Sequence, residues 1–271
     1  MIKSCKILLF ALLILTSPNF ASEREHRIIS LMPSQTELLF YMGFGENLVG
    51  VSDYCNFPPE VKNLPKIGGL ELNLEQIVLL KPSVIVDLGG MHQKYAFFFQ
   101  QVGIKYTDYR INSLDDIPSA AVSLAHDLRK PERGERFRKQ WKETINGLSP
   151  MPQISPKVYV EIWDEPIQSA GPSSFIGEMI EKVGGKNIIP QDIQNYPIVN
   201  PEQIIKANPD FILIAYPIPD IEKIYERPGW SEISAIRRKN VIKLDYDIFV
   251  RPGPRCLEGM KMLSKIFSSM E

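Results

Sequence analysis

The residues that most clearly suggest chemistry are two glutamates in a repeated segment. Residues 73–85 read NLEQIVLLKPSVI, and residues 200–212 read NPEQIIKANPDFI. Each copy starts with an asparagine that can cap a helix and places a glutamate, Glu75 or Glu202, in the first turn, where the helix dipole favours a carboxylate. One interpretation is capping alone. The other is a matched pair of exposed acids, one on each of two similar lobes, that docks on a partner.

A search for catalytic chemistry finds no arrangement that would support it. The chain has no GxSxG motif, no Gly-rich phosphate loop and no HExxH motif. His26, His92 and His126 are scattered, which argues against a three-histidine metal site. Asp245 and Asp247 could form an acid/base pair, but at the end of a strand their side chains would point to opposite faces. We therefore predict no catalytic residues and no metal site.

The N-terminal residues have the pattern of a secretory signal peptide. Lys3 and Lys6 precede an apolar run at residues 7–15, which is too short to span a bilayer, and small and polar residues follow it. We predict that residues 1–22 are a cleaved signal peptide and that the mature protein is periplasmic. Cys55 and Cys256 remain in the mature chain, and a disulfide between them is possible in an oxidising compartment.

Charge excludes one class of partner. The formal net charge of the whole chain is −1, and it becomes more negative when the two lysines of the signal peptide are removed. Nucleic-acid binding calls for a basic surface, so we predict no nucleic-acid partner.

Strands and helices alternate along the chain at short spacings, which is typical of parallel βα units. The predicted strands are residues 27–31, 48–51, 84–86, 105–109, 157–163, 187–189, 211–215 and 241–244. The fold class is therefore α/β, with two lobes of parallel sheets flanked by helices. We place the N-terminal lobe at residues 23–128 and the C-terminal lobe at residues 151–271.

One long helix is predicted to join the lobes within residues 129–150. The segment at residues 132–148 is highly charged, which is typical of a solvated helix, and it would be about 25 Å long at 1.5 Å per residue.

Ligands of open α/β sheets bind beyond the carboxyl ends of the strands. Several aromatic and charged residues follow predicted strand ends: Tyr54, Leu88, Trp163, Tyr196, Tyr216, Asp247 and Arg251. If the two lobes face each other, these strand ends line a single cleft between them.

Four sequence blocks resemble one known family. They are RIISLxPSxTE at residues 27–37, VGVSxY at residues 49–54, the first repeat at residues 73–85, and RPGPR at residues 251–255. On these blocks the chain resembles the periplasmic substrate-binding proteins of ABC importers for cobalamin and iron chelates, and it is closest to the cobalamin-binding branch. The resemblance covers essentially the whole mature chain.

The resemblance implies two α/β lobes joined by one long helix, with the ligand between the lobes. It also implies that one glutamate per lobe docks on arginines of the membrane permease, and those glutamates fall on Glu75 and Glu202. Positions that contact the corrinoid in the cobalamin-binding branch correspond here to Tyr54, Asp247 and Arg251. The full set of predicted ligand-binding residues is Tyr54, Trp163, Tyr196, Tyr246, Asp247 and Arg251.

The chain departs from the cobalamin-binding pattern at several aromatic positions. Three tryptophan positions and one phenylalanine position of that branch correspond here to Gly69 or Leu70, Leu88, Tyr196 and Gln168. Trp163 could restore aromatic area in the cleft, or it could pack in the core of its lobe.

Two classes of function stay open at this point. The first is an exported binding protein that captures cobalamin or a related corrinoid and delivers it to an ABC importer. A ferric siderophore or haem is the alternative ligand, since Arg251, Arg255 and Tyr246 would also suit anionic iron chelates. The second class is an exported small-molecule enzyme, for which the sequence offers no nucleophile with a nearby base. We expect no intrinsic cofactor and a monomeric protein.

Overall fold

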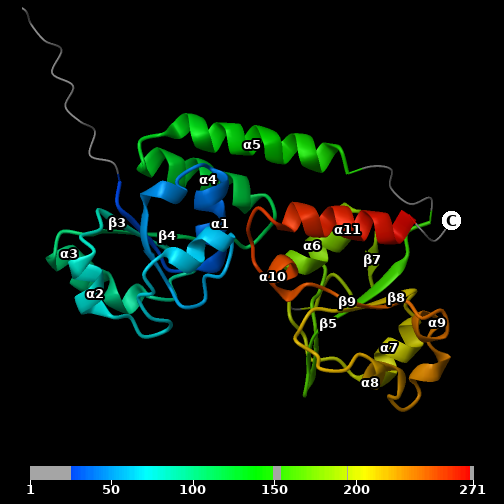
Figure 1. Ribbon diagram of the computed structural model, residues 1–271. Helices are drawn as coiled ribbons and strands as arrows, with labels where there is room; N and C mark the ends of the chain where they lie inside the picture. Colours follow the sequence, from blue (N-terminus) through cyan, green and yellow to red (C-terminus); the bar gives the residue numbers. More distant parts are fainter. Residues whose placement is uncertain (1–25, 149–153, 194, 269–271) are drawn as a thin grey trace, which may run out of the picture.

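The computed structural model describes residues 26–148, 154–193 and 195–268, so the predicted signal peptide lies outside the described part of the chain. The first sheet has four parallel strands in the order β2-β1-β3-β4 (Figure 1). These are β1 (Ile28–Ser30), β2 (Leu48–Val51), β3 (Val84–Leu88) and β4 (Lys105–Tyr109).

Helices cover both faces of the first sheet because alternate side chains of a strand point to opposite sides. Ile28, Val84 and Val86 belong to one apolar cluster, whereas Ile29 and Ile85 belong to another. The helices of this lobe are α1 (Pro33–Tyr41), α2 (Leu74–Leu79), α3 (Ala96–Gln101) and α4 (Asp116–Asp127), with short 3-10 turns η1 (Gly45–Asn47), η2 (Pro59–Asn63) and η3 (Gln93–Tyr95).

The second sheet repeats this plan with one addition. Its strands are β5 (Lys157–Asp164), β6 (Ile167–Ser169), β7 (Lys186–Asn187), β8 (Phe211–Ile214) and β9 (Val241–Lys243). The order is β6-β5-β8-β9, and β7 pairs with the start of β5. The sheet is parallel except for β6, an edge strand that folds back antiparallel on β5 and that the sequence pattern did not indicate.

The helices of the second lobe pack around this sheet. They are α6 (Phe175–Lys182), α7 (Pro201–Ala207), α8 (Glu222–Tyr225), α9 (Ser234–Arg237), α10 (Tyr246–Phe249) and α11 (Cys256–Ser268), with the 3-10 turn η4 (Trp230–Glu232). Residues 230–237, for which the sequence pattern predicts one helix, form two short turns instead, and the strand expected at residues 187–189 ends at Asn187.

The long helix α5 (Pro131–Asn146) runs beside α4 and across the top of both lobes (Figure 1). It is not solvated on all sides, because Gly134, Phe137 and Trp141 are buried. Gly134 permits the close approach of α4, since a Cβ atom there would lie 2.7 Å from the Cα of Val122. Helix α5 is therefore packed against the protein along one face. The lobe boundaries at residues 23–128 and 151–271 stay a prediction.

Two local expectations are wrong. The serine and glutamate spaced three apart at Ser34 and Glu37 predict a capping box, but the two residues do not form one: α1 begins after Met32, which makes no side-chain cap, and both residues are buried. Asp245 is not on a strand, because its carboxylate caps α10 by accepting from the backbone N–H of Asp247 at 2.9 Å.

Cys55 and Cys256 are not linked by a disulfide. Both are buried free thiols. The hydroxyl of Thr36 donates to the Sγ atom of Cys55 at 3.1 Å, and burial raises the pKa of the Cys256 thiol.

Candidate functional site

The two copies of the repeat form matching helix starts. The side chain of Asn73 accepts from the backbone N–H of Gln76 at 3.0 Å, and that of Asn200 accepts from the backbone N–H of Glu202 at 2.9 Å. The asparagines are therefore the helix caps, as predicted, and the glutamate carboxylates take no part in capping. Glu75 and Glu202 are both exposed, and within the described chain neither carboxylate has a hydrogen-bond or ion-pair partner.

The two glutamates lie in different lobes on one side of the molecule. Glu75 is in the first turn of α2 and Glu202 is in the first turn of α7. Figure 1 shows α2 and α7 on the side of the molecule that faces away from α5. This placement agrees with the expected docking geometry, and the docking role itself stays a prediction.

Four predicted ligand contacts are aromatic side chains with large exposed fractions. Tyr54, Trp163, Tyr196 and Tyr246 are 47%, 52%, 46% and 47% exposed. Trp163 therefore does not pack in the core of its lobe. Its indole N–H donates to the carbonyl of Glu165 at 2.9 Å, which fixes the ring at the end of β5.

Tyr196 and Tyr246 meet at one cavity of the second lobe. The cavity has a volume of about 230 Å³. It is lined by Ile162, Phe175, Ile176, Tyr196, Ala215, Tyr246, Phe249 and Val250. Tyr54, from the first lobe, packs on Gly69, where a Cβ atom would come within 2.9 Å of the tyrosine hydroxyl oxygen. Gly69, which with Leu70 is one of the two candidates for a tryptophan position of the cobalamin-binding pattern, thus makes room for this ring.

The other two predicted contacts belong to a charged cluster that bridges the lobes. Arg251 donates from Nη1 to Glu37 at 3.2 Å and to Asn56 at 2.7 Å, and from Nη2 it forms an ion pair with Asp247 at 2.7 Å. Arg255 donates two hydrogen bonds to the same Glu37 carboxylate, at 2.8 and 2.7 Å. Asn56 completes the cluster by donating to Asp247 at 2.9 Å.

The charges of this interlobe cluster balance. Glu37 and Asp247 face Arg251 and Arg255, and the Glu37 side chain is only 2% exposed. Burial alone would lower the pKa of Arg255, but the hydrogen bonds and charge of Glu37 outweigh it and hold this pKa above its ordinary value. Both arginines therefore already have carboxylate partners, so neither is a free receptor for an anionic ligand.

Comparison with known proteins agrees with this architecture. A family model described as periplasmic binding protein matches residues 28–248. The chain belongs to the periplasmic binding protein family. It is 28% identical over 271 residues to a vitamin B12-binding protein of Vibrio vulnificus, covering 97% of both chains.

Two solved structures of the periplasmic binding protein type are also similar. A possible iron-binding solute-binding protein of Staphylococcus epidermidis has a TM-score of 0.80 and 28% identity, covering 89% of this chain and 98% of that one. A periplasmic heme-binding protein of Roseiflexus sp. RS-1 has a TM-score of 0.79 and 27% identity, covering 90% and 98%. The relatives thus carry more than one ligand name on the same fold.

The periplasmic binding protein contains a buried histidine that the sequence left unassigned. His92 is fully buried. Its Nε2 lies 3.0 Å from the carbonyl oxygen of Gly69, and its Nδ1 lies 3.1 Å from the carboxylate of Asp87. The carbonyl of Gly69 is an acceptor, and so is the Asp87 carboxylate when it is ionised, so the arrangement favours a proton on each ring nitrogen. His92 thereby links the Gly69 loop, on which Tyr54 packs, to the Asp87 carboxylate of β3.

In the folded protein the pKa of His92 is raised and the pKa of Asp87 is lowered. Burial alone would lower the pKa of His92 and raise that of Asp87. The hydrogen bonds between the two groups, with a further one from Tyr106 to Asp87 at 2.7 Å, outweigh burial, so the His92 pKa is raised and the Asp87 pKa is lowered.

We expect this pair to make stability pH-dependent. The contribution of His92 is complete below its ordinary pKa of 6.5 and is lost as the pH rises through the raised folded value. The contribution of Asp87 is complete above its ordinary pKa of 3.8 and is lost as the pH falls through the lowered folded value. Urea unfolding of wild type should therefore show decreasing stability above pH 6.5, and His92→Gln should remove that component. His126→Gln, at an exposed histidine, is the control and should leave the slope unchanged.

A second buried charge lies on the central part of the sheet in the C-terminal lobe. Glu161, on β5, is fully buried. It accepts from Arg227 at 2.6 and 2.7 Å, from Tyr216 at 2.8 Å and from Tyr159 at 3.0 Å. The ring of Tyr216 in turn lies 6.4 Å from that of Trp163. Sequence reasoning gave no role to Glu161 or Arg227, because a lone acid in an apolar strand carries no motif.

Within the described residues there is no group of three or more His, Cys, Asp or Glu side chains that could hold a metal ion. The helices of the same part of the chain include none long and apolar enough to cross a membrane.

Proposed function

We propose that this protein is an exported substrate-binding protein that captures cobalamin or a related corrinoid between its lobes and delivers it to an ABC importer. The supporting observation is the pairing of exposed aromatic rings with a charge-balanced cluster. Tyr54, Trp163, Tyr196 and Tyr246 offer flat apolar faces, and Asp247 and Arg251 offer polar contacts whose charges are already neutralised.

This arrangement suits a large ligand of low net charge. Aromatic side chains bury much area and still present a polar group at the edge of the ring. A ligand with several carboxylates or catecholates would need unpaired cations, whereas Arg251 and Arg255 are held by Glu37 and Asp247. The vitamin B12-binding relative over nearly the whole chain supports the same choice.

An iron chelate or haem is the second candidate ligand. It is favoured by the iron- and heme-binding names of the similar structures and by the hydroxyls of Tyr54, Tyr196 and Tyr246 at the cleft.

Ligand titration separates the candidates. The protein without residues 1–22 should be mixed with cyanocobalamin, haem and ferric siderophores and followed by calorimetry and visible absorption. We expect a reversible 1:1 complex with the corrinoid, weakened by Trp163→Ala. Phe97→Ala, which removes an exposed ring on α3, is the control and should bind normally. Absence of heat with the corrinoid, together with binding of haem or a siderophore, would replace the first candidate by the second.

We propose that Glu75 and Glu202 dock this protein on arginines of the importer's membrane subunits. Removing one partner of a charge pair at a desolvated interface commonly costs about 2–5 kcal/mol, whereas a carboxylate in the first turn of a helix adds only about 0.3–1 kcal/mol to folding. Glu75→Ala and Glu202→Ala should therefore lower uptake by the cognate importer and leave ligand affinity and Tm nearly unchanged, and the double variant should be worse. Normal uptake with both variants would reduce the glutamates to helix-end charges.

A further inference from the structure

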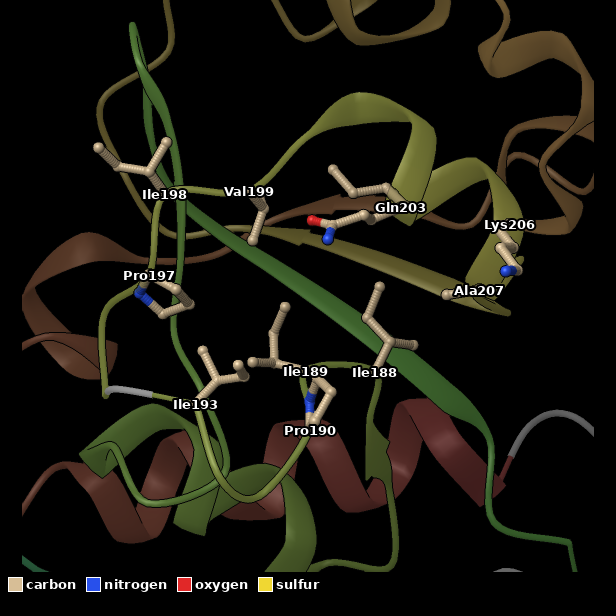
Figure 2. Close-up of a pocket in the computed structure, with 11 residues that line it drawn as sticks. Ile188, Ile189, Pro190, Ile193, Pro197, Ile198, Val199, Gln203, Lys206 and Ala207 are labelled. Atoms are coloured by element: carbon tan, nitrogen blue, oxygen red, sulfur yellow. The ribbon is translucent and has the colours of Figure 1, made fainter.

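A second pocket lies on the C-terminal lobe, and it shares no lining residue with the cavity at Tyr196 and Tyr246. Its volume is about 530 Å³, which is within the range of small-molecule and side-chain sites. The loop after β7 forms one wall and α7 forms the other (Figure 2). The lining is apolar except for Gln203 and Lys206: Ile188, Ile189, Pro190, Ile193, Pro197, Ile198, Val199, Ile204 and Ala207.

Two apolar side chains at the rim of this pocket are exposed to solvent. Ile198 is 68% exposed and Ile193 is 40% exposed. Figure 2 shows Ile188, Ile189 and Ile193 on one side of the hollow, with Val199 and Gln203 opposite them. A single exposed isoleucine is ordinary, but two at the mouth of an apolar hollow mark a contact surface.

The position of Glu202 indicates what covers this surface. Glu202 and the pocket residue Lys206 are four residues apart on α7, so their side chains are neighbours on one helix face. A group that pairs with Glu202 is therefore about one helical turn, or about 5.4 Å, from the mouth of the pocket. The partner that meets the acid must also meet the pocket.

The other lobe presents a different surface beside its glutamate. The repeat aligns Lys206 with Leu79, which follows Glu75 by four residues and is 72% exposed. A protruding leucine thus accompanies Glu75, whereas a pocket with a lysine at its rim accompanies Glu202. Each lobe therefore carries the same exposed glutamate, but the surfaces next to the two glutamates differ in shape and charge.

We infer that the pocket receives an apolar side chain from the loop of the membrane subunit whose basic residue pairs with Glu202. The inference rests on the proposed docking function and adds the recognition chemistry at one lobe: a leucine- or phenylalanine-sized group next to a cation. Because Leu79 accompanies Glu75 and the pocket accompanies Glu202, the importer can bind this face in only one orientation.

The test measures binding of ligand-loaded protein to the cognate importer in nanodiscs. Ala207→Phe fills the pocket, and Ile198→Glu puts a charge at its mouth. Each should raise the Kd for the importer at least tenfold, with unchanged corrinoid affinity and Tm. Met262→Glu, at an exposed position of α11, should bind like wild type. In a double-mutant cycle with Glu202→Ala, the losses should be less than additive, because one loop makes both contacts.

Each contrary outcome has one meaning. If Glu202→Ala weakens docking while both pocket variants dock normally, the pocket inference is wrong and the docking proposal stands. If Glu202→Ala docks normally, the docking proposal is wrong. The inference that one importer loop contacts both Glu202 and the pocket is then wrong as well. If a small apolar molecule co-purifies with wild type in native mass spectrometry, is lost in Ala207→Phe, and docking is unaffected, the pocket is a ligand site and the inference is overturned.

Discussion

Arg227→Ala should lower the free energy of unfolding by about 3–5 kcal/mol, because it leaves a carboxylate buried without its cation. Glu161 is fully buried, and the guanidinium supplies two of the four hydrogen bonds that it accepts. The two tyrosine hydroxyls that remain cannot neutralise the charge. The arginine also stacks on Trp230, 4.6 Å from its ring centre, so packing is lost as well.

Urea unfolding followed by circular dichroism measures this loss. Arg238→Ala is the matched control, since Arg238 is a mostly exposed arginine at 3.8 Å from Asp210. An exposed pair of this kind contributes less than about 1 kcal/mol. Equal destabilisation by the two variants would show that Glu161 is not dependent on Arg227. Replacing both partners, as in Glu161→Gln with Arg227→Met, should recover part of the loss because no unpaired charge then remains.

Arg227→Ala should also change the environment of Trp163, one of the predicted ligand contacts. Tyr216 hydrogen-bonds Glu161 and lies against Trp163, so a loosened cluster frees the tryptophan ring. We expect the intrinsic fluorescence of Arg227→Ala to be less sensitive to ligand than that of wild type, measured at a temperature where both proteins are folded.

The parts of the fold that follow from local pattern were predictable. Strand and helix periodicity gave both sheets, and the asparagine caps of the repeat appear where the sequence placed them. Strand β6 was missed because it is an edge strand of only three residues. Helix α5 was assigned to solvent because its charges hide a narrow apolar face built on Phe137 and Trp141.

The structural positions of the candidate site residues were predictable only where a residue lies at the end of a strand. The exposed rings of Tyr54 and Trp163 follow from that rule. Glu37 does not, because a serine followed three residues later by a glutamate fits a capping box equally well, and its true partner Arg251 lies 214 residues away in sequence. Long-range partners of this kind are fixed by tertiary packing and leave no local signal.

Glu37→Gln should change which ligands the cleft accepts. The carboxylate of Glu37 receives both Arg251 and Arg255 and balances their charge across the lobes. The amide keeps the size of the side chain but removes its charge. Because two arginines are then left with Asp247 alone, the cleft gains a net positive charge. The loss of a buried ionic partner should also lower the free energy of unfolding by about 3–5 kcal/mol, so binding should be measured well below the Tm of the variant.

We expect Glu37→Gln to bind haem or a ferric catecholate at least tenfold more tightly than wild type, which corresponds to about 1.4 kcal/mol. The gain should shrink as salt is raised, because screening weakens the attraction between the freed arginines and an anionic ligand. Binding of neutral cyanocobalamin should not tighten. Glu46→Gln, at an exposed glutamate of η1, is the control and should leave all affinities unchanged. If folded Glu37→Gln binds the anionic ligands no better than wild type, the charge balance of the interlobe cluster does not select the ligand. The aromatic rings would then have to carry the selectivity alone.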